Sequence, residues 1–313
     1  MCTAIGYKNN GKYLFGRTLD VCASYGEKIV VMPRNFPFTF KVGKALESHH
    51  AVMGTAIVAK GLPLYYDAMN DKGLCMAGLN FPGNAVYHPV ASDKVNLAPF
   101  EIIPYILGKC ASLDEARSEL KNISIADVSF SKEMPHTPLH WIIGDKSGEI
   151  VVESVKDGLK VYDNPAGVLT NNPPFESQLF NLKNYARLST RNPENAFSAE
   201  LDLSAYSRGM GAMGMPGDWS SPSRFVRAAF VKFNYAAPET GATAHDFLRM
   251  LDVVFVPRGC VDTEDGFQYT VYSCCCDTAL GRYYIKNYAG EITFADFKNY
   301  SLNGNNLFVK TET

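Results

Sequence analysis

The residue with the most reactive potential in this chain is Cys2, which directly follows the initiator Met1. Methionine is usually removed before a small side chain, so we expect Cys2 to become the N-terminal residue. It would then carry a thiol together with a free α-amine, a group that titrates near ~7.7–8.0. An unprotonated amine can act as the base while the sulfur attacks a carbonyl, in place of a separate histidine. The start of the chain therefore predicts an N-terminal nucleophile.

The residues after Cys2 predict a β-hairpin whose turn falls within residues 9–11, where asparagine and glycine tolerate positive φ. If the turn is residues 10–11, Cys2 pairs with Leu19 and Arg17 lies one diagonal away. If the turn is residues 9–10, Cys2 pairs directly with Arg17. Both registers place the thiol and the guanidinium on the same face of the sheet, where a permanent cation favours the thiolate.

Four further polar side chains are candidates for the same site. Asn80 and Asn171 each follow a strand pattern beside a proline-containing turn. Their amides could donate hydrogen bonds to a developing oxyanion, and the alternative is a role in the turns themselves. Arg224 lies in the first turn of a predicted helix, where a cation opposes the helix dipole, so contact with a ligand or carboxylate is the alternative to solvent exposure. Asp20 has the wrong strand parity for the thiol face unless the backbone turns just before it.

The elements that must position these residues are strands separated by short turns. Strand patterns fall at residues 27–34, 51–58, 63–70, 74–80, 140–145, 149–155, 268–275, 282–288 and 291–297. The short connections favour antiparallel hairpins over parallel units with crossover helices. Helical patterns fall at residues 98–110, 112–122, 178–188, 223–233 and 244–254. Two layers of strands with blocks of helices predict an α+β layered architecture in one domain.

Composition excludes several classes of function. The chain has 313 residues, of which 46% are hydrophobic and 20% charged, as is typical of a globular protein. It contains no apolar run long enough to span a membrane. A formal net charge of −2 offers no basic face for nucleic acid. The first residues show no secretory signal, so we expect a cytoplasmic location with cysteines present as thiols. Small molecules are the expected partners.

Three patterns that resemble known sites predict structural roles instead. Residues 207–219 contain a G-x-G-x-x-G spacing, but a proline and a glycine follow where a dinucleotide fingerprint needs a helix, so we expect a mobile loop near a site. Cys274, Cys275 and Cys276 alternate faces within a predicted strand and have no partner at a metal-ligand spacing. The histidines form no ligand spacing either. We expect no metal and no organic cofactor.

Five segments occur in the order, and at about the intervals, seen in one enzyme family. They are MCTAIGY at residues 1–7, FGRTLD at 15–20, YYDAMNDKGLCMAGLNFPG at 65–83, VLTNNPPF at 168–175 and GMPGDWSSPSRF at 214–225. On these motifs the chain resembles the bile salt hydrolases of the choloylglycine hydrolase family, which are N-terminal nucleophile hydrolases. The resemblance extends over essentially the whole chain.

The resemblance implies a four-layer αββα sandwich of two antiparallel sheets flanked by helices, formed by one domain from residue 2 to residue 313. It implies hydrolysis of the amide that joins a bile acid to glycine or taurine, with Cys2 as the nucleophile. The other matching site residues are Arg17, Asp20, Asn80, Asn171 and Arg224. Asp20 would hold the α-amine, whereas Asn80 and Asn171 would line the oxyanion hole or hold the polar end of the substrate.

The resemblance also bears on the substrate and the assembly. Penicillin V acylases of the same family tend to carry tyrosine at the position of Asn80, so this asparagine favours bile salts. Leu19, Tyr66, Phe130 and Met134 match variable positions that cover the steroid in relatives, and an ordinary core position is the alternative for each. A penicillin V acylase and a non-catalytic steroid-binding protein remain alternative functions. Because relatives are often tetramers, the resemblance implies a homotetramer.

Overall fold

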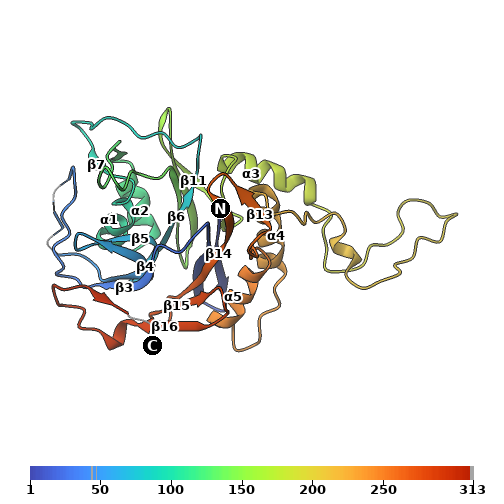
Figure 1. Cartoon of the computed structure of the whole chain (residues 1–313). Helices are drawn as coiled ribbons and strands as arrows, with labels where there is room; N and C mark the ends of the chain where they lie inside the picture. Colours follow the sequence, from blue (N-terminus) through green and yellow to red (C-terminus); the bar gives the residue numbers. More distant parts are fainter. Residues whose placement is uncertain (44, 47, 311–313) are drawn as a thin grey trace.

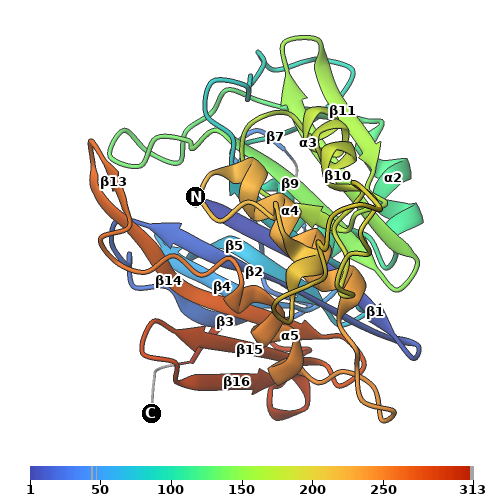
Figure 2. The same ribbon diagram turned by 90° about the vertical axis from the view of Figure 1, so that its right-hand side faces the viewer.

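Two large antiparallel sheets form the centre of the computed structural model, which describes residues 1–43, 45–46 and 48–310. The first sheet has the strand order β12-β1-β2-β14-β15-β16, with β13 paired to β14. Its strands are β1 (Cys2–Asn9), β2 (Lys12–Val21), β12 (Val168–Leu169), β13 (Val261–Thr263), β14 (Gly266–Asp277), β15 (Arg282–Asn287) and β16 (Ile292–Asp296). Strands from the first twenty-one residues and from the C-terminal part of the chain therefore pair within one sheet (Figure 2).

The second sheet has the strand order β11-β10-β9-β6-β5-β4-β3-β17. Its strands are β3 (Lys28–Met32), β4 (Val52–Ala59), β5 (Leu62–Asn70), β6 (Cys75–Asn80), β9 (Leu139–Asp145), β10 (Gly148–Val155), β11 (Gly158–Asp163) and β17 (Phe308–Val309). A separate pair of short parallel strands, β7 (Val95–Leu97) and β8 (Ile123–Ile125), lies outside both sheets.

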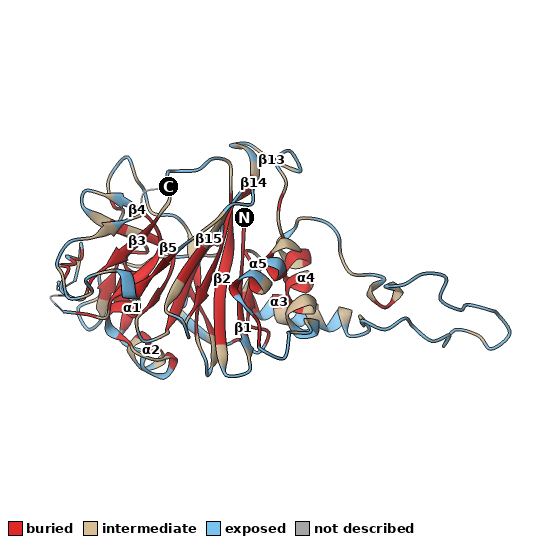
Figure 3. Cartoon of the chain, turned by 90° about the horizontal axis from the view of Figure 1, so that it is seen from below, coloured by how far each residue is buried: buried red, intermediate tan, exposed pale blue. Residues whose placement is uncertain are grey.

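Helices cover the outer face of each sheet, so the layers follow the order helix, sheet, sheet, helix (Figure 3). On the second sheet lie α1 (Ile102–Lys109) and α2 (Leu113–Leu120). On the first sheet lie α4 (Ser221–Asn234) and α5 (Ala244–Asp252), and α3 (Phe175–Leu182) packs beside α4. Short 3₁₀ turns occur at Lys183–Tyr185, Met210–Ala212 and Phe297–Asn299. The predicted α+β sandwich is confirmed.

Two apolar clusters hold the layers together. One contains Phe15, Ile142, Tyr272 and Phe247, and it joins the facing sides of the two sheets to the underside of α4 and α5. The other contains Trp141 and Ile106 and lies between the second sheet and helices α1 and α2. Burial on both faces explains why strands such as β6 are apolar throughout rather than alternating.

Each strand expected from the sequence is present, and the differences have local causes. The strands β7, β8, β12, β13 and β17 have two or three residues each, too few for a periodic pattern. Helix α1 begins at Ile102 rather than at residue 98, because the Glu101 carboxylate accepts hydrogen bonds from the backbone N–H of Ala98 and Lys41 and closes a turn there. Helix α3 begins earlier than expected, at Phe175.

The segment between α3 and α4 leaves the body of the molecule as a long arm, residues 186–219 (Figure 1). It includes the glycine- and methionine-rich residues 207–219 and carries exposed apolar side chains, among them Phe197 and Tyr206 at 86% and 85% exposure. None of the helices in the described part of the chain has the length and hydropathy needed to cross a membrane.

Candidate active site

The β1–β2 hairpin places Cys2 opposite Leu19. Its turn is Asn10-Gly11, and both residues have positive φ (48° and 76°), as a tight primed turn requires. This is the first of the two registers that the sequence allowed, so Arg17 lies one diagonal from Cys2. Both side chains are buried, at 3% and 1% exposure.

Arg17 is a buried cation between the two sheets. Its Nη1 donates to the carbonyl of Gly78 on β6 (2.7 Å) and its Nε donates to the carbonyl of Thr18 (3.0 Å), while its Nη2 has no partner among the described residues. Burial lowers the pKa of the guanidinium. The neighbouring Cys2, together with Tyr272, Asp67 and Cys274, raises that pKa by more than burial lowers it, so the net shift is upward. Arg17 therefore stays charged behind the thiol.

The acidic residue whose negative charge acts on Arg17 is Asp67, which the sequence patterns did not single out. Its carboxylate, 0% exposed, accepts hydrogen bonds from Tyr272 (2.6 Å), from Tyr283 and from the thiol of Cys274 (3.2 Å). Burial raises the pKa of Asp67, and Arg17 and the hydroxyl donors oppose that rise. A lone acid within the apolar strand β5 was the signal in the sequence that could have identified this residue.

The nitrogen of Cys2 is held by Asn171. Met1 is present in this structure, so the peptide nitrogen of Cys2 occupies the place that its α-amine would take after Met1 is removed. That nitrogen donates to Oδ1 of Asn171 at 2.8 Å, and Nδ2 of Asn171 donates to the carbonyl of Asn80 at 2.7 Å. The Asn171 side chain thus connects the start of β1 to the end of β6.

Arg224 completes this junction from α4. Its Nη1 donates to the carbonyl of Cys2 (2.5 Å) and to Oγ1 of Thr3 (2.6 Å), and its Nη2 donates to Oδ1 of Asn171 (2.7 Å). Of the two alternatives left open by the sequence, solvent exposure is excluded because Arg224 is 0% exposed, and its described hydrogen bonds are to carbonyl and hydroxyl oxygens rather than to a carboxylate. Burial lowers the pKa of Arg224, while Asp20 and Cys2 oppose the shift.

Asp20 lies on the opposite face of β2 from the thiol, as its parity predicts, because the strand continues to Val21. Its carboxylate accepts hydrogen bonds from Thr18 (3.1 Å) and Thr270 (2.7 Å). A bulge in β14 between Thr270 and Tyr272 allows the former to face Asp20 while the latter reaches the space between the sheets. The backbone of Asp20 pairs with Met1, whose amine donates to the Asp20 carbonyl (2.5 Å) and whose carbonyl accepts from the Asp20 N–H (3.0 Å).

Asn80 and Asn171 differ in what their side chains do. The Asn171 amide is occupied at both ends by the contacts already described. The side chain of Asn80 makes no hydrogen bond to another described residue, and its Oδ1 is buried without a partner. Asn80 lies next to this junction through its own carbonyl, and no hydrogen bond to another described residue occupies its side-chain amide.

The residues expected to contact substrate are spread more widely. Leu19 is buried directly across from Cys2. Tyr66 on β5 is half-buried; its pKa is raised chiefly by burial, and the positive charge of Arg17 opposes the rise. Phe130 is buried, with its ring 5.4 Å from that of Phe100, and the backbone N–H of Met134 donates to Ser131 in the same loop. No described contact joins Phe130 or Met134 to Cys2.

The cavity on the side of α1 does not mark this site. A cavity of about 1160 Å³ is lined by residues that include Arg34, His50, Tyr105 and Lys109, on the side of α1. None of the polar residues around Cys2 lines it. The chemistry at Cys2 is therefore recognised from hydrogen-bond geometry and not from the size of a cavity.

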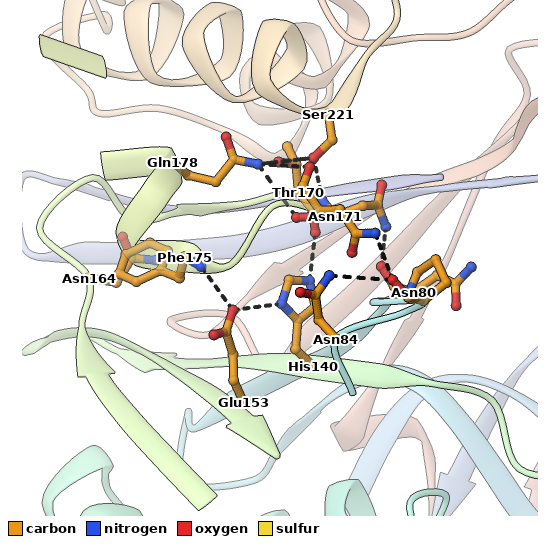
Figure 4. Close-up of polar contacts among 12 residues, drawn as sticks. Asn80, Asn84, His140, Glu153, Asn164, Thr170, Asn171, Phe175, Gln178 and Ser221 are labelled. Atoms are coloured by element: carbon orange, nitrogen blue, oxygen red, sulfur yellow. Dashed lines mark hydrogen bonds and ion pairs between the residues drawn. The ribbon is translucent and has the colours of Figure 1, made fainter. Parts of the chain in front are cut away.

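Several supporting residues were missed from the sequence. The Oγ of Ser221 accepts from the Asn171 N–H (2.8 Å), and Gln178 donates to the Ser221 Oγ (3.1 Å). A buried pair, His140 and Glu153, lies beneath the same segment (Figure 4). The sequence signals were a histidine and a glutamate within the largely apolar strands β9 and β10, and these signals become specific only once the pairing of the strands is known.

The model of the linear amide C–N hydrolases, choloylglycine hydrolase family, matches residues 2–310. A bile salt hydrolase/transferase of Lactiplantibacillus plantarum is 48% identical over 290 residues, which cover 92% of this chain and 89% of that protein. A bile salt hydrolase/transferase of Clostridium perfringens is 34% identical over 314 residues, covering 98% and 95%.

Solved structures give the same result. The crystal structure of the mutant C2A conjugated bile acid hydrolase from Clostridium perfringens has a TM-score of 0.93 and 33% identity, and the match covers 100% of this chain and 97% of that chain. Penicillin V acylase from Agrobacterium tumefaciens has a TM-score of 0.76 at 20% identity, covering 96% and 88%. The second match is a likeness of fold alone.

Proposed function

Because this chain belongs to the choloylglycine hydrolase family of linear amide C–N hydrolases, we propose that it hydrolyses the amide of glycine- or taurine-conjugated bile salts. The reaction proceeds through a Cys2 acyl-enzyme and releases the free bile acid and the amino acid. The relatives named as bile salt hydrolases and conjugated bile acid hydrolases support this substrate class. The resemblance drawn from the sequence is confirmed.

The first step is attack by sulfur. After removal of Met1, the α-amine of Cys2 accepts the proton of the thiol, and the thiolate forms a C–S bond with the amide carbonyl carbon. The carbonyl electrons move to oxygen, which becomes a tetrahedral oxyanion. The contact of Asn171 Oδ1 with the Cys2 nitrogen orients the amine, since an acceptor at 2.8 Å fixes the direction of one N–H. The buried charge of Arg17 favours the thiolate.

The second step is collapse of the tetrahedral intermediate. We propose the Asn80 side-chain amide as a donor to the oxyanion, because it makes no hydrogen bond to another described residue while the Asn171 amide is already engaged. The amine gives its proton to the departing nitrogen as the C–N bond breaks, and the amino acid leaves. Water then attacks the thioester carbon while the amine takes a proton from it. The C–S bond breaks, the amine returns the proton to the sulfur, and the bile acid is released.

The remaining site residues keep supporting roles in this proposal. Arg224 holds the Cys2 carbonyl and the Asn171 side chain in one arrangement. Asp20 is proposed to hold the α-amine, because removal of Met1 frees its backbone N–H and carbonyl beside the new amino group. Leu19 and Tyr66 are proposed to line the acyl side of the site, and Phe130 and Met134 to contribute from the loop after β8.

One observation carries the proposal: the nitrogen and the sulfur of a single residue lie where a buried arginine, an oriented asparagine and an unoccupied asparagine amide meet. Hydrolysis of glycocholate and taurocholate, compared with that of phenoxymethylpenicillin, tests it. We expect turnover of one or both bile salts to dominate, and Cys2→Ala to abolish it in a folded protein. Preference for the penicillin would favour the acylase alternative, and binding of bile salts without turnover would favour a binding protein.

Acyl transfer is a second activity of the same intermediate. The relatives at 48% and 34% identity carry the name hydrolase/transferase. If an amine takes the place of water, its nitrogen attacks the thioester carbon and loses a proton to the Cys2 amine. The C–S bond breaks, the proton passes to the sulfur, and a new amide is formed. Supplying excess amino acid with a conjugated bile salt should then produce a new conjugate in the wild type and none in Cys2→Ala.

We also propose a homotetramer in which the arm, residues 186–219, contributes to the subunit contacts. Its support is the exposure of Phe197, Tyr206 and Leu201 on a segment that extends away from the body, since large apolar side chains on a protruding segment favour association. Free thiols at all eight cysteine positions support the proposed cytoplasmic location.

A single domain over residues 2–313 is the proposed organisation. It is supported by the pairing of N-terminal with C-terminal strands in both sheets, β2 with β14 and β3 with β17. The last three residues of that range, 311–313, lie outside the described part of the chain.

A further inference from the structure

A buried ion pair lies between the two sheets at the edge where Asn80 and Asn171 are found. His140 on β9 and Glu153 on β10 are directly opposite each other in the strand register, and their side chains are 0% and 1% exposed. Nδ1 of His140 lies 3.2 Å from Oε1 of Glu153, and Nε2 lies 2.8 Å from the carbonyl of Thr170 (Figure 4). The imidazole therefore has an oxygen partner at each of its two nitrogens.

This pair fixes both ends of the segment that carries Asn171. His140 donates to the carbonyl of Thr170, the residue just before Asn171. Glu153 Oε1 accepts from the backbone N–H of Phe175, at the start of α3 (3.0 Å). The turn between β12 and α3 is therefore attached at its beginning and at its end to the same two side chains.

The other face of His140 contacts the segment that carries Asn80. The ring of Phe81, the residue after Asn80, stacks on the imidazole with 4.2 Å between ring centroids and an interplanar angle of 6°. The backbone of Leu79, the residue before it, pairs with His140 in the strand register. One histidine thus contacts the neighbours of both site asparagines.

Stability alone explains this pair poorly. Burying two charges costs desolvation energy, and replacing a buried ion pair with apolar residues of similar volume is often neutral or stabilising. An apolar pair makes no directional hydrogen bonds, so it could not hold the Thr170 carbonyl and the Phe175 N–H at fixed angles. The cost of the pair is thus accounted for by the placement of the segment between Thr170 and Phe175.

We propose that His140 and Glu153 are positioning residues that set Asn171 and Asn80 relative to the nitrogen and sulfur of Cys2. The inference rests on the proposed function, since it assigns these asparagines to the amide hydrolysis. Neither residue touches the substrate. They act by holding two segments in the register that the reaction requires.

The test compares His140→Phe with His140→Gln in the full-length protein, using glycocholate and taurocholate. Phenylalanine keeps the stacking on Phe81 but removes both polar contacts, and glutamine keeps a donor for the Thr170 carbonyl. We expect kcat to fall about 100-fold in His140→Phe with KM changed less than about 2-fold, because a misplacement of about 1 Å at the reacting groups has an effect of that size. His140→Gln should recover most of the loss.

His49→Phe is the matched control. His49 is also buried and also contacts two carbonyls, those of Phe36 and His50, but it lies near α1. It should lose thermal stability and keep its kcat. If His140→Phe does not fold, Glu153→Gln provides the milder test, because its amide oxygen still accepts from Phe175 while the charge is removed, and it should lower kcat without changing KM.

The outcomes separate this inference from the proposed function. Folded His140→Phe with wild-type kcat, a loss expressed in KM alone, or an equal loss of kcat in His49→Phe would overturn the positioning role while leaving the hydrolase assignment intact. A wild-type protein that hydrolyses no bile conjugate would overturn both.

Discussion

The nitrogen of Cys2 and Oδ1 of Asn171 are 2.8 Å apart, and this hydrogen bond joins the first strand of one sheet to the turn after β12. Because the same oxygen also accepts from Arg224, the Asn171 side chain has a fixed orientation with its carbonyl oxygen towards Cys2. Its amide nitrogen is consequently directed at the Asn80 carbonyl. The two asparagines, equivalent in the sequence argument, have separate tasks in the structure.

This separation predicts different phenotypes for the two alanine variants. Asn80→Ala should lower kcat by about 10²–10³, the usual effect of removing one oxyanion donor, with little change in melting temperature. Asn171→Ala should lower both kcat and the melting temperature, because it leaves the Cys2 nitrogen and Arg224 without their common acceptor. Steady-state kinetics and thermal unfolding of both variants give the comparison. Equal losses of stability would be inconsistent with an unengaged Asn80 side chain.

Arg224 should tolerate no replacement by lysine. Its guanidinium donates to three different acceptors on β1 and Asn171 and to the Trp219 carbonyl, and one ammonium group cannot satisfy this fork. We expect Arg224→Lys to lose about 3 kcal/mol of unfolding free energy and most of its turnover. Denaturant unfolding and kinetics measure the two effects.

Arg227→Lys, one turn further along α4, is the control for that prediction. Arg227 also donates to backbone carbonyls, those of Pro216, Asp218 and Val253, but it does not contact Cys2 or Asn171. It should lose some stability and keep its turnover. A parallel loss of activity in both variants would argue that α4 as a whole, and not the Arg224 contacts, supports the site.

Local sequence patterns were sufficient to predict the hairpin, the positions of most of the longer strands and the parity of Asp20, but not strand β11. Parity followed from strand geometry alone, and the observed Cys2–Leu19 register was one of only two that the turn allowed. The sandwich of two antiparallel sheets was implied by family resemblance and by the short turns. These features depend on residues close in sequence or on motifs that recur in order.

What the sequence could not provide were contacts made by the pairing of distant strands. The roles of Asp67, His140 and Glu153 arise because β5 faces β14, and because β9 lies between β6 and β10. Each is a charged or polar residue in a largely apolar strand, which signals a buried partner without identifying it. The acceptors of Arg224 on β1 and after β12 could not be predicted from the sequence either, because they lie far from Arg224 in the chain.

Asp67 makes the stability of the protein depend on pH in a definite direction. Burial raises the pKa of its carboxyl in the folded state, so the folded protein binds this proton more tightly than the unfolded chain does. As pH rises from the unfolded value of ~3.9 through the higher folded value, the contribution of this group to stability falls. Asp67→Asn lacks this titration.

As pH is raised from ~4 to ~7, the wild type should therefore lose stability relative to Asp67→Asn, so the free energy of unfolding of the variant should increase relative to that of the wild type. Urea unfolding at several pH values measures this difference, and the other acidic groups cancel because both proteins contain them. A difference that is constant across the range, or one that moves against the variant, would exclude the raised pKa.

The arm predicts how assembly can be disrupted without affecting the fold. Replacing both Phe197 and Tyr206 with serine should lower the molar mass in solution below that of a tetramer. The melting temperature of the variant should stay close to that of the wild type. Light scattering after size-exclusion chromatography measures the mass. Phe180→Ser and Phe233→Ser are matched controls, since these side chains are exposed on α3 and α4 rather than on the arm. An unchanged mass in the arm variant would remove the arm from the subunit interface.

The account depends most directly on Cys2 being the terminal residue of the working enzyme. Intact-mass spectrometry of the active protein, before and immediately after mixing with a conjugated bile salt and quenching in acid, examines this point. We predict a chain that begins at Cys2 and, after mixing, a thioester adduct of the bile acyl group on the Cys2 peptide. A fully active protein that retains Met1, or an adduct on any other residue, would contradict the central claim.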